Sequence, residues 1–439
     1  MMPPSVITDR VSAIVLTRPT GIVWIGAFLL SLALTGLLAV GIGYLLVEGV
    51  GIWGLDIPVA WAFAITDYVW WIAIGMAGTF ISGALYLTRQ TWRTSINRYA
   101  EAMTVFAVAV SGLFPILHLG RPWFFYWLAP YPNRMGTWPQ WRSSLEWDFF
   151  AVVAYLTVSI VYWYVGMIPD FGSLRDRAST RGRQVFYGLL ALGWRGEARH
   201  WKRYDTLVLL LAALAVPLVF SVHSMVALDF SEGLLPGWHE TVFPPFFIAG
   251  ALFSGFAMVL VLGLPLRRSF GLQEFITERH IDNLAKVLLA AGLVVDYSYV
   301  EEIFNAFYSM DSYAVAMTMQ RFVGAYAWVF WTTIACNVVA IQALWFPRVR
   351  RHHGALFGIG VLVLVGMWFE RFLLIVGSLY HDFLPSSWGM FYPTFWDLAF
   401  LFGSIGLFFT LFLLFVRLLP MVSMFELRKL AHKLGEGAT

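Results

Sequence analysis

Ten stretches of this chain are each apolar over the roughly 20 residues that a helix needs to cross a lipid bilayer. Their approximate bounds are 21–46, 61–88, 99–119, 147–167, 206–228, 244–266, 282–303, 321–346, 355–379 and 394–418. A bilayer offers no water to the backbone, so each stretch is expected to be a helix with its hydrogen bonds satisfied internally. The sequence therefore predicts an all-α integral membrane protein with ten transmembrane helices.

The composition supports a membrane protein and excludes some kinds of site. Of the 439 residues, 59% are hydrophobic and 13% are charged, whereas soluble domains are about a quarter charged. The single cysteine, Cys336, cannot form an intrachain disulfide or supply the several thiolates of an iron–sulfur cluster. Only His118 and His223 lie on apolar stretches. We therefore expect no haem, iron–sulfur cluster or other metal in this chain.

Lysine and arginine alternate strongly between successive loops. The two termini and the loops at 89–98, 168–205, 267–281 and 347–354 carry most of the 29 basic residues. The alternate loops hold only Arg121, Arg134 and Arg142. Because basic loops remain in the cytoplasm, both termini are predicted to be cytoplasmic in an inner (plasma) membrane. The stretch "HLGRPWFFYWLAP", which begins at His118, is then predicted to face outward.

A weak internal repeat with an offset of 181 residues aligns Arg98 with Arg279 and His118 with Tyr299. It predicts two similarly oriented four-helix bundles, made of the second to fifth and the sixth to ninth helices, with the first and tenth helices beside them. The corresponding division of the chain is 1–60 for the N-terminus and first helix, 61–228 for the first bundle with the ligand site, 229–379 for the second bundle, and 380–439 for the last helix and tail.

His118, Asp148 and Asp229 lie at the outward ends of three successive predicted helices. Antiparallel neighbours would bring these ends together, and ionisable residues inside a membrane are candidates for function. An imidazole beside carboxylates in an apolar setting can accept protons from a hydroxyl, as the oxidation of a quinol requires. Arg121 would support this site. Each residue taken alone is more typical of a solvent-wetted interface, and only the set of residues favours a ligand site.

Several long motifs, rich in tryptophan and proline, resemble the NrfD/PsrC-like quinone-binding membrane subunits, and among them the C subunit of alternative complex III. These motifs are "TRQTWRTSINR", "FPILHLGRPWFFYWLAPYPN", "WPQWRSSLEWD", "SVHSMVALDF" and "GWHETVFPPFFIAGALFSG". The resemblance extends over roughly residues 15–425. One departure is Met76, at a position where relatives are expected to have a histidine.

The resemblance implies a menaquinol site near the outer face, with Asp148, Asp229 and His118 handling protons and Trp147 and Tyr131 in contact with the quinol. It also implies a proton route whose candidates are Asp67, His223, Asp296, Tyr299, Glu370 and Arg371. Since Glu370 and Arg371 are adjacent on a helix, we expect them to reach separate neighbours. The implied partners are an iron–sulfur/molybdopterin-like subunit on the outer face, multihaem cytochrome c subunits, a homologous membrane subunit and lipids, with no nucleic acid.

These observations favour a quinol-oxidising membrane subunit of a respiratory or photosynthetic chain, active only within its complex and with proton translocation as a further role. Three alternatives stay open. The chain could be the membrane anchor of a molybdopterin/polysulfide-type reductase, a secondary transporter, or a purely structural anchor. The transporter alternative lacks the broken helices near the midplane that such proteins use.

Overall fold

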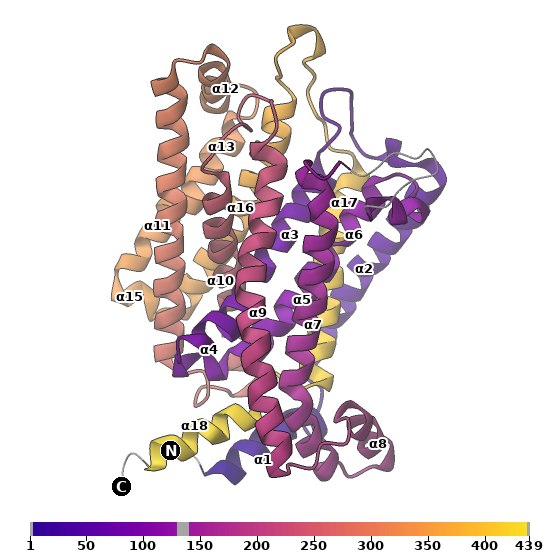
Figure 1. The fold of residues 1–439 in the computed structure, drawn as a ribbon, viewed down its shortest axis with the longest axis vertical. Coiled ribbons are helices and arrows are strands. Elements are labelled where there is room, and N and C mark those ends of the chain that lie inside the picture. Colours follow the sequence, from indigo (N-terminus) through magenta and orange to yellow (C-terminus); the bar gives the residue numbers. More distant parts are fainter. Residues whose placement is uncertain (1–2, 130–139, 437–439) are drawn as a thin grey trace.

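The computed structural model describes residues 3–129 and 140–436, with side chains up to residue 432. Within these ranges every regular element is a helix, and most helices run along the long axis of the molecule (Figure 1). The two ends of the chain lie at the same end of the molecule. We refer to this end as the terminal end and to the other as the distal end.

Nine helical segments in the described ranges are long and apolar enough to cross a membrane, so the protein is a multi-pass membrane protein. These are α2 (Ile22–Glu48), α3 with η2 and α4 (Phe63–Thr79, Phe80–Ala84, Leu85–Leu87), α5 with α6 (Asn97–Ser111, Leu113–His118), α7 (Ser144–Arg177), α9 (Ala198–Ser231), α10 (Phe243–Phe270), α13 with η5, α14 and η6 (Ala327–Ile334, Ala335–Val339, Ala340–Gln342, Ala343–Trp345), α16 (His353–Leu379) and α17 (Phe395–Leu418).

The remaining helices are mostly short. They are α1 (Pro4–Leu16), η1 (Val50–Ile52), η3 (Thr91–Ser95), η4 (Pro122–Leu128), α8 (Arg181–Leu190), α11 (Glu278–Ser309), α12 (Ser312–Val323), α15 (Pro347–Arg350), η7 (Pro385–Ser387) and α18 (Met424–Glu436). The predicted span 282–303 lies inside α11, which has 32 residues but is not among the nine membrane-spanning candidates. Its apolar stretch is interrupted by Lys286 and Asp296.

The predicted spans overlap the observed helices, but several of their ends differ, as at the start of α9, which lies at Ala198 and not at 206. Helix α7 continues to Arg177, past the predicted end at 167, because its additional turns pack inside the protein, where Phe171 and Leu174 are buried. The predicted span 321–346 begins too early, since Arg321 belongs to the separate helix α12 and the membrane-spanning segment begins at Ala327. A hydropathy pattern does not reveal the break between these two helices.

Helices α3 and α10 form the centre of the molecule. In the most apolar stretch of each, 83% of the residues are buried, compared with 17% in α2. Helix α3 packs against α5, α10 and α16, whereas α2 packs mainly against α17. Small residues permit the close contacts: a Cβ added at Gly255 of α10 would lie 2.6 Å from the Cβ of Ala77 in α3.

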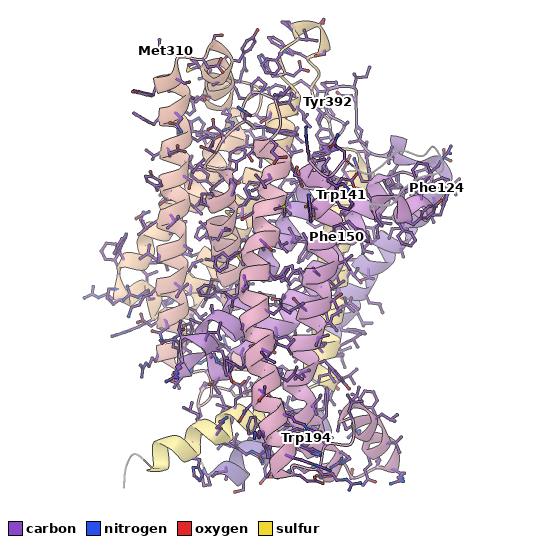
Figure 2. The ribbon with its side chains drawn as sticks, viewed as in Figure 1. Phe124, Trp141, Phe150, Trp194, Met310 and Tyr392 are labelled. Carbon is purple, nitrogen blue, oxygen red and sulfur yellow. The ribbon has the colours of Figure 1, made fainter. Side chains whose placement is uncertain are left out.

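Aromatic side chains lie at both ends of the molecule as well as in its core. Figure 2 shows Trp141, Phe150 and Tyr392 toward the distal end and Trp194 at the terminal end. Tryptophan and tyrosine prefer the boundary between lipid and water, where an apolar ring and a polar group are both satisfied. The positions of these aromatic residues therefore agree with helices that run from one membrane surface to the other.

Candidate functional site

A cavity of about 560 Å³ lies among α3, α6, α7, α9 and η4. Most of its lining is apolar and aromatic, including Ile65, Val69, Phe125, Phe149 and Val152. His118, Asp148 and Asp229 all line it, together with Tyr68. The structure thus brings the end of α6, the beginning of α7 and the end of α9 to one site. We call it the first cavity.

The carboxyl groups of Asp148 and Asp229 form the polar wall of the first cavity. The hydroxyl of Tyr68 donates a hydrogen bond to Asp148 Oδ2 at 3.1 Å. The two carboxyl groups are within hydrogen-bonding reach of each other. When both are ionised, neither carries a proton that it could donate to the other. Oδ1 of each is then buried without a hydrogen-bond partner among the described residues. One proton held between them would satisfy the pair, so the arrangement is suited to receiving a proton.

His118 lies on another part of the same lining. Its Nδ1 atom is buried and has no hydrogen-bond partner in the described part of the protein. The imidazole is nearly parallel to the indole of Trp53, with ring centroids 6.3 Å apart and 12° between the planes. An imidazole held in place with one nitrogen free can bond to a ligand or exchange a proton with it.

Trp53 is itself held by the beginning of α17. The backbone N–H of Gly54 donates to Asp397 Oδ2 at 2.9 Å, and the Thr394 hydroxyl donates to the Ile52 carbonyl at 2.8 Å. Thr394 and Asp397 also form a capping box at the N-terminus of α17. The loop that carries Trp53 is therefore anchored on both sides of the residue that contacts His118.

Sequence reasoning missed Tyr68 and Trp53. Tyr68 follows the predicted candidate Asp67 directly, and an ionisable tyrosine on an apolar stretch was a usable signal. Trp53 offered none, because its role depends on a loop folding back over a helix end more than 60 residues away. Among the other predicted quinol contacts, Arg121 and Trp147 are outside the lining of the first cavity, and Tyr131 lies outside the described residues.

A much smaller cavity, of about 40 Å³, lies among α10, α11, α12, α13 and α16, and we call it the second cavity. Tyr299 and Glu370 line it, together with the ion pair of Arg321 and Glu302. The Asn337 side chain donates to the Tyr299 hydroxyl at 2.9 Å. Polar groups are therefore also concentrated in the second half of the chain, but with little open space.

The prediction that Glu370 and Arg371 reach separate neighbours is wrong. Arg371 Nη1 lies 3.0 Å from Glu370 Oε1, and both side chains are buried. Long side chains on adjacent residues can bend toward each other, and the apolar surroundings favour this pairing of opposite charges. The Arg371 guanidinium also lies over the Phe247 ring, 4.0 Å from its centroid, which gives the cation a second favourable contact.

The remaining candidates for a proton route are scattered rather than joined. Asp67 is buried and accepts a hydrogen bond from the Trp368 indole at 2.7 Å. Asp296 accepts one from Gln342 at 3.2 Å. His223 is buried, with Nδ1 2.8 Å from the Val219 carbonyl oxygen and Nε2 without a partner in the described part of the protein. These contacts do not form a continuous chain of hydrogen bonds among the described residues.

Comparison with known proteins identifies the family. Residues 53–381 match the family described as polysulphide reductase, NrfD. The chain belongs to the NrfD family. A relative from Halobacterium salinarum (strain ATCC 700922 / JCM 11081 / NRC-1), described as a putative membrane subunit of dimethyl sulfoxide reductase, is 26% identical over 360 residues. The aligned part covers 80% of this chain and 76% of that protein. The match to the family includes the helices that form both cavities.

Proposed function

We propose that this NrfD-family chain is the quinol-binding membrane subunit of a quinol-oxidising electron-transfer complex, with menaquinol bound in the first cavity. The observation that carries the proposal is a roomy apolar cavity with a carboxyl pair and an imidazole on its lining. Its volume is within the range of small-molecule sites, about 300–1,000 Å³. Apolar walls suit a quinone ring, while Asp148, Asp229 and His118 supply its polar partners.

The protein groups receive the protons that quinol oxidation releases. A bound quinol gives up two electrons and two protons. The Asp148–Asp229 pair takes one proton, which gives a hydrogen bond to two carboxyl groups whose buried Oδ1 atoms otherwise have no partner in the part of the chain that the structure describes. Tyr68 orients Asp148 through its hydrogen bond to Oδ2. His118 Nδ1 takes the other proton, with Trp53 fixing the plane of the ring.

The wider arrangement belongs to the same proposal. Ten transmembrane helices, α11 included, cross the inner membrane, and eight of them form two four-helix bundles with the first and tenth beside them. The distal end faces outward, and both termini lie in the cytoplasm. The electrons pass to an iron–sulfur/molybdopterin-like subunit docked at the distal end and then to multihaem cytochrome c subunits, as in alternative complex III. The proposed complex also contains a homologous membrane subunit. Its further role is proton translocation, with the route formed by Asp67, His223, Asp296, Tyr299, Glu370 and Arg371.

A second candidate is favoured by the relative named as a dimethyl sulfoxide reductase membrane subunit. In that case the chain anchors a molybdopterin- or polysulfide-type reductase, and the first cavity performs the same quinol chemistry. The two candidates differ in the protein that receives the electrons. Proteins that copurify with the chain distinguish them, because multihaem cytochromes support the first candidate and a single molybdopterin subunit supports the second.

Quinol turnover by the purified complex tests the proposed site directly. We expect His118→Ala and Asp148→Asn each to lower menaquinol turnover strongly. Glu146→Gln is the matched control, because Glu146 lies on the same helix two residues from Asp148 but does not line the cavity. Wild-type turnover and menaquinol affinity in both cavity variants would refute the site.

A further inference from the structure

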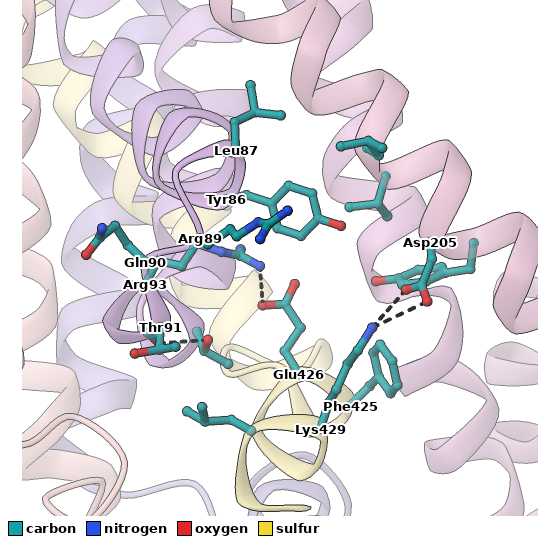
Figure 3. Close-up of a pocket in the computed structure, with 15 residues that line it drawn as sticks. Tyr86, Leu87, Arg89, Gln90, Thr91, Arg93, Asp205, Phe425, Glu426 and Lys429 are labelled. Carbon is teal, nitrogen blue, oxygen red and sulfur yellow. Dashed lines mark hydrogen bonds and ion pairs between the residues drawn. The ribbon is translucent and has the colours of Figure 1, made fainter. Parts of the chain in front are cut away.

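A second large cavity, of about 490 Å³, lies at the terminal end and is separate from both cavities described above. It is bounded by α4, η3, α9 and α18. Figure 3 shows Glu426 of α18 between Arg93 on one side and Lys429 on the other, with Asp205 of α9 beyond the lysine. Arg89 belongs to the same lining. We call this the terminal cavity.

The charges of the terminal cavity do not balance. Arg93 Nη2 pairs with Glu426 Oε2 at 2.9 Å, and Lys429 Nζ pairs with Asp205 Oδ1 at 3.1 Å. These pairs neutralise both carboxylates of the lining. Arg89 is exposed and has no carboxylate within ion-pair distance in the described ranges. One positive charge is therefore left over, and the cavity would attract one negative charge.

The backbone at Arg89 provides an independent observation. Arg89 follows the end of α4 with φ +58°, in the left-handed region. Its N–H donates to the Tyr86 carbonyl at 2.9 Å, and the next N–H, of Gln90, donates to the Leu85 carbonyl at 2.8 Å. Glycine, which has no side-chain clash there, is the usual residue at such a helix end. Arginine is unusual at such a position, which it shares here with Leu192 and Met310, and it places an exposed cationic side chain on the lining of the terminal cavity.

The wall of the terminal cavity formed by Leu87 and Leu209 is apolar and exposed on the outside of the protein. Leu87, at the end of α4, is 40% exposed, and Leu209 of α9 is 49% exposed. Both belong to segments that are long and apolar enough to cross a membrane, where an exposed leucine is suited to contact lipid chains. Arg89, Arg93 and Lys429 lie just beyond the ends of these apolar walls. A charged group placed where apolar helix surface ends is at the level of phospholipid headgroups.

We propose that the terminal cavity binds one anionic phospholipid, with its phosphate at Arg89 and one acyl chain along Leu87 and Leu209. The excess positive charge selects an anionic headgroup over a zwitterionic one, and the apolar wall selects a lipid over a free anion. Because α18 contributes Lys429 and Glu426 to this cavity, the lipid would also hold the C-terminal helix against α9. This role does not depend on the proposed quinol chemistry.

Native mass spectrometry of the full chain in its purified complex, with phosphatidylglycerol or phosphatidylcholine added, tests the proposal. We expect wild-type protein to retain one phosphatidylglycerol in preference to phosphatidylcholine. Arg89→Gln should lower the phosphatidylglycerol affinity about fivefold, which is the usual effect of one basic residue at a membrane surface. Arg268→Gln is the matched control, since Arg268 is another exposed arginine, near the end of α10, outside this cavity.

Arg89→Gly separates lipid binding from folding. Glycine removes the cation and also relieves the left-handed backbone, so the melting temperature without added lipid should stay the same or rise while lipid retention falls. Equal retention of both lipids, or unchanged phosphatidylglycerol affinity in Arg89→Gln, would overturn the proposal. Displacement of the lipid by inorganic phosphate at millimolar concentration would also overturn it, because the site would then recognise a free anion.

Discussion

The first and second cavities both contain acidic and aromatic residues, but they differ in how much open space they hold and in whether ion pairs with arginine are seen beside their carboxyl groups in the described ranges. In the first, about 560 Å³ of mostly apolar space is next to Asp148, Asp229 and His118, each with a buried polar atom that has no partner in the described ranges. In the second, about 40 Å³ remains, and the Arg321–Glu302 and Arg371–Glu370 pairs place carboxylates beside cations, although Glu370 and Arg371 also have buried polar atoms without a hydrogen-bond partner in the described ranges. Open space beside polar groups indicates a ligand site, whereas a cavity of about 40 Å³ is too small to hold a quinol.

The largest expected effect comes from removing the carboxyl pair of the first cavity. We expect the Asp148→Asn and Asp229→Asn double variant to lose about 100-fold or more in menaquinol turnover, the usual magnitude for a lost general base. Steady-state turnover of the purified complex measures it. Glu302→Gln in the second cavity should retain most of the turnover per folded molecule. Equal losses in both cavities would remove the distinction between them.

Breaking the ion pair of the second cavity should affect stability instead. Arg321 and Glu302 have side chains only 13% and 17% exposed, and removing one partner of a buried pair costs about 3 kcal/mol. We therefore expect Glu302→Gln to lower the melting temperature markedly. The double variant Glu302→Leu and Arg321→Met should recover part of the loss, since it leaves no unpaired charge. A melting temperature unaffected by Glu302→Gln would contradict a structural role for this pair.

Two tyrosines allow a matched comparison of the cavities. Tyr68 donates to Asp148, and Tyr299 accepts from Asn337. Losing a hydrogen bond to a charged carboxylate costs about 1.5 kcal/mol, so Tyr68→Phe should reduce menaquinol turnover about tenfold. Tyr299→Phe should leave menaquinol affinity unchanged. Menaquinol affinity and turnover are measured on both variants. A larger loss of affinity in Tyr299→Phe than in Tyr68→Phe would place the quinol site in the second cavity instead of the first.

The smallest expected effect is a pH dependence near the second cavity. Burial and the nearby Glu302 and Glu301 raise the pKa of Glu240 to about 7 from its usual 4.5, although Arg321 opposes the shift. The folded protein therefore holds this proton more tightly than the unfolded chain does. Stability from this group should decline as the pH rises from about 4.5 to about 7 and then level off. Melting curves of Glu240→Gln should lack this slope, and an identical slope would contradict the shift.

Hydropathy alone predicted much of the fold, because the bilayer requires long apolar helices with few alternatives. It could not show that Arg321 belongs to α12, since the break before Ala327 depends on local backbone geometry. The meeting of His118, Asp148 and Asp229 followed from their places at adjacent helix ends. The contact of Trp53 with His118, and its anchoring by Asp397 and Thr394, depend on long-range loop packing that no periodicity in the sequence encodes.

The position of the bound quinone tests the central claim most directly. A photoreactive azido-menaquinone would be bound to the purified complex, irradiated, and located by mass spectrometry of the labelled peptides. We predict labelling within 125–128 or 145–153, which contribute to the first cavity, and suppression of the label by excess menaquinone. Labelling at the second cavity, for example within 330–334, that excess menaquinone also suppresses would contradict the account.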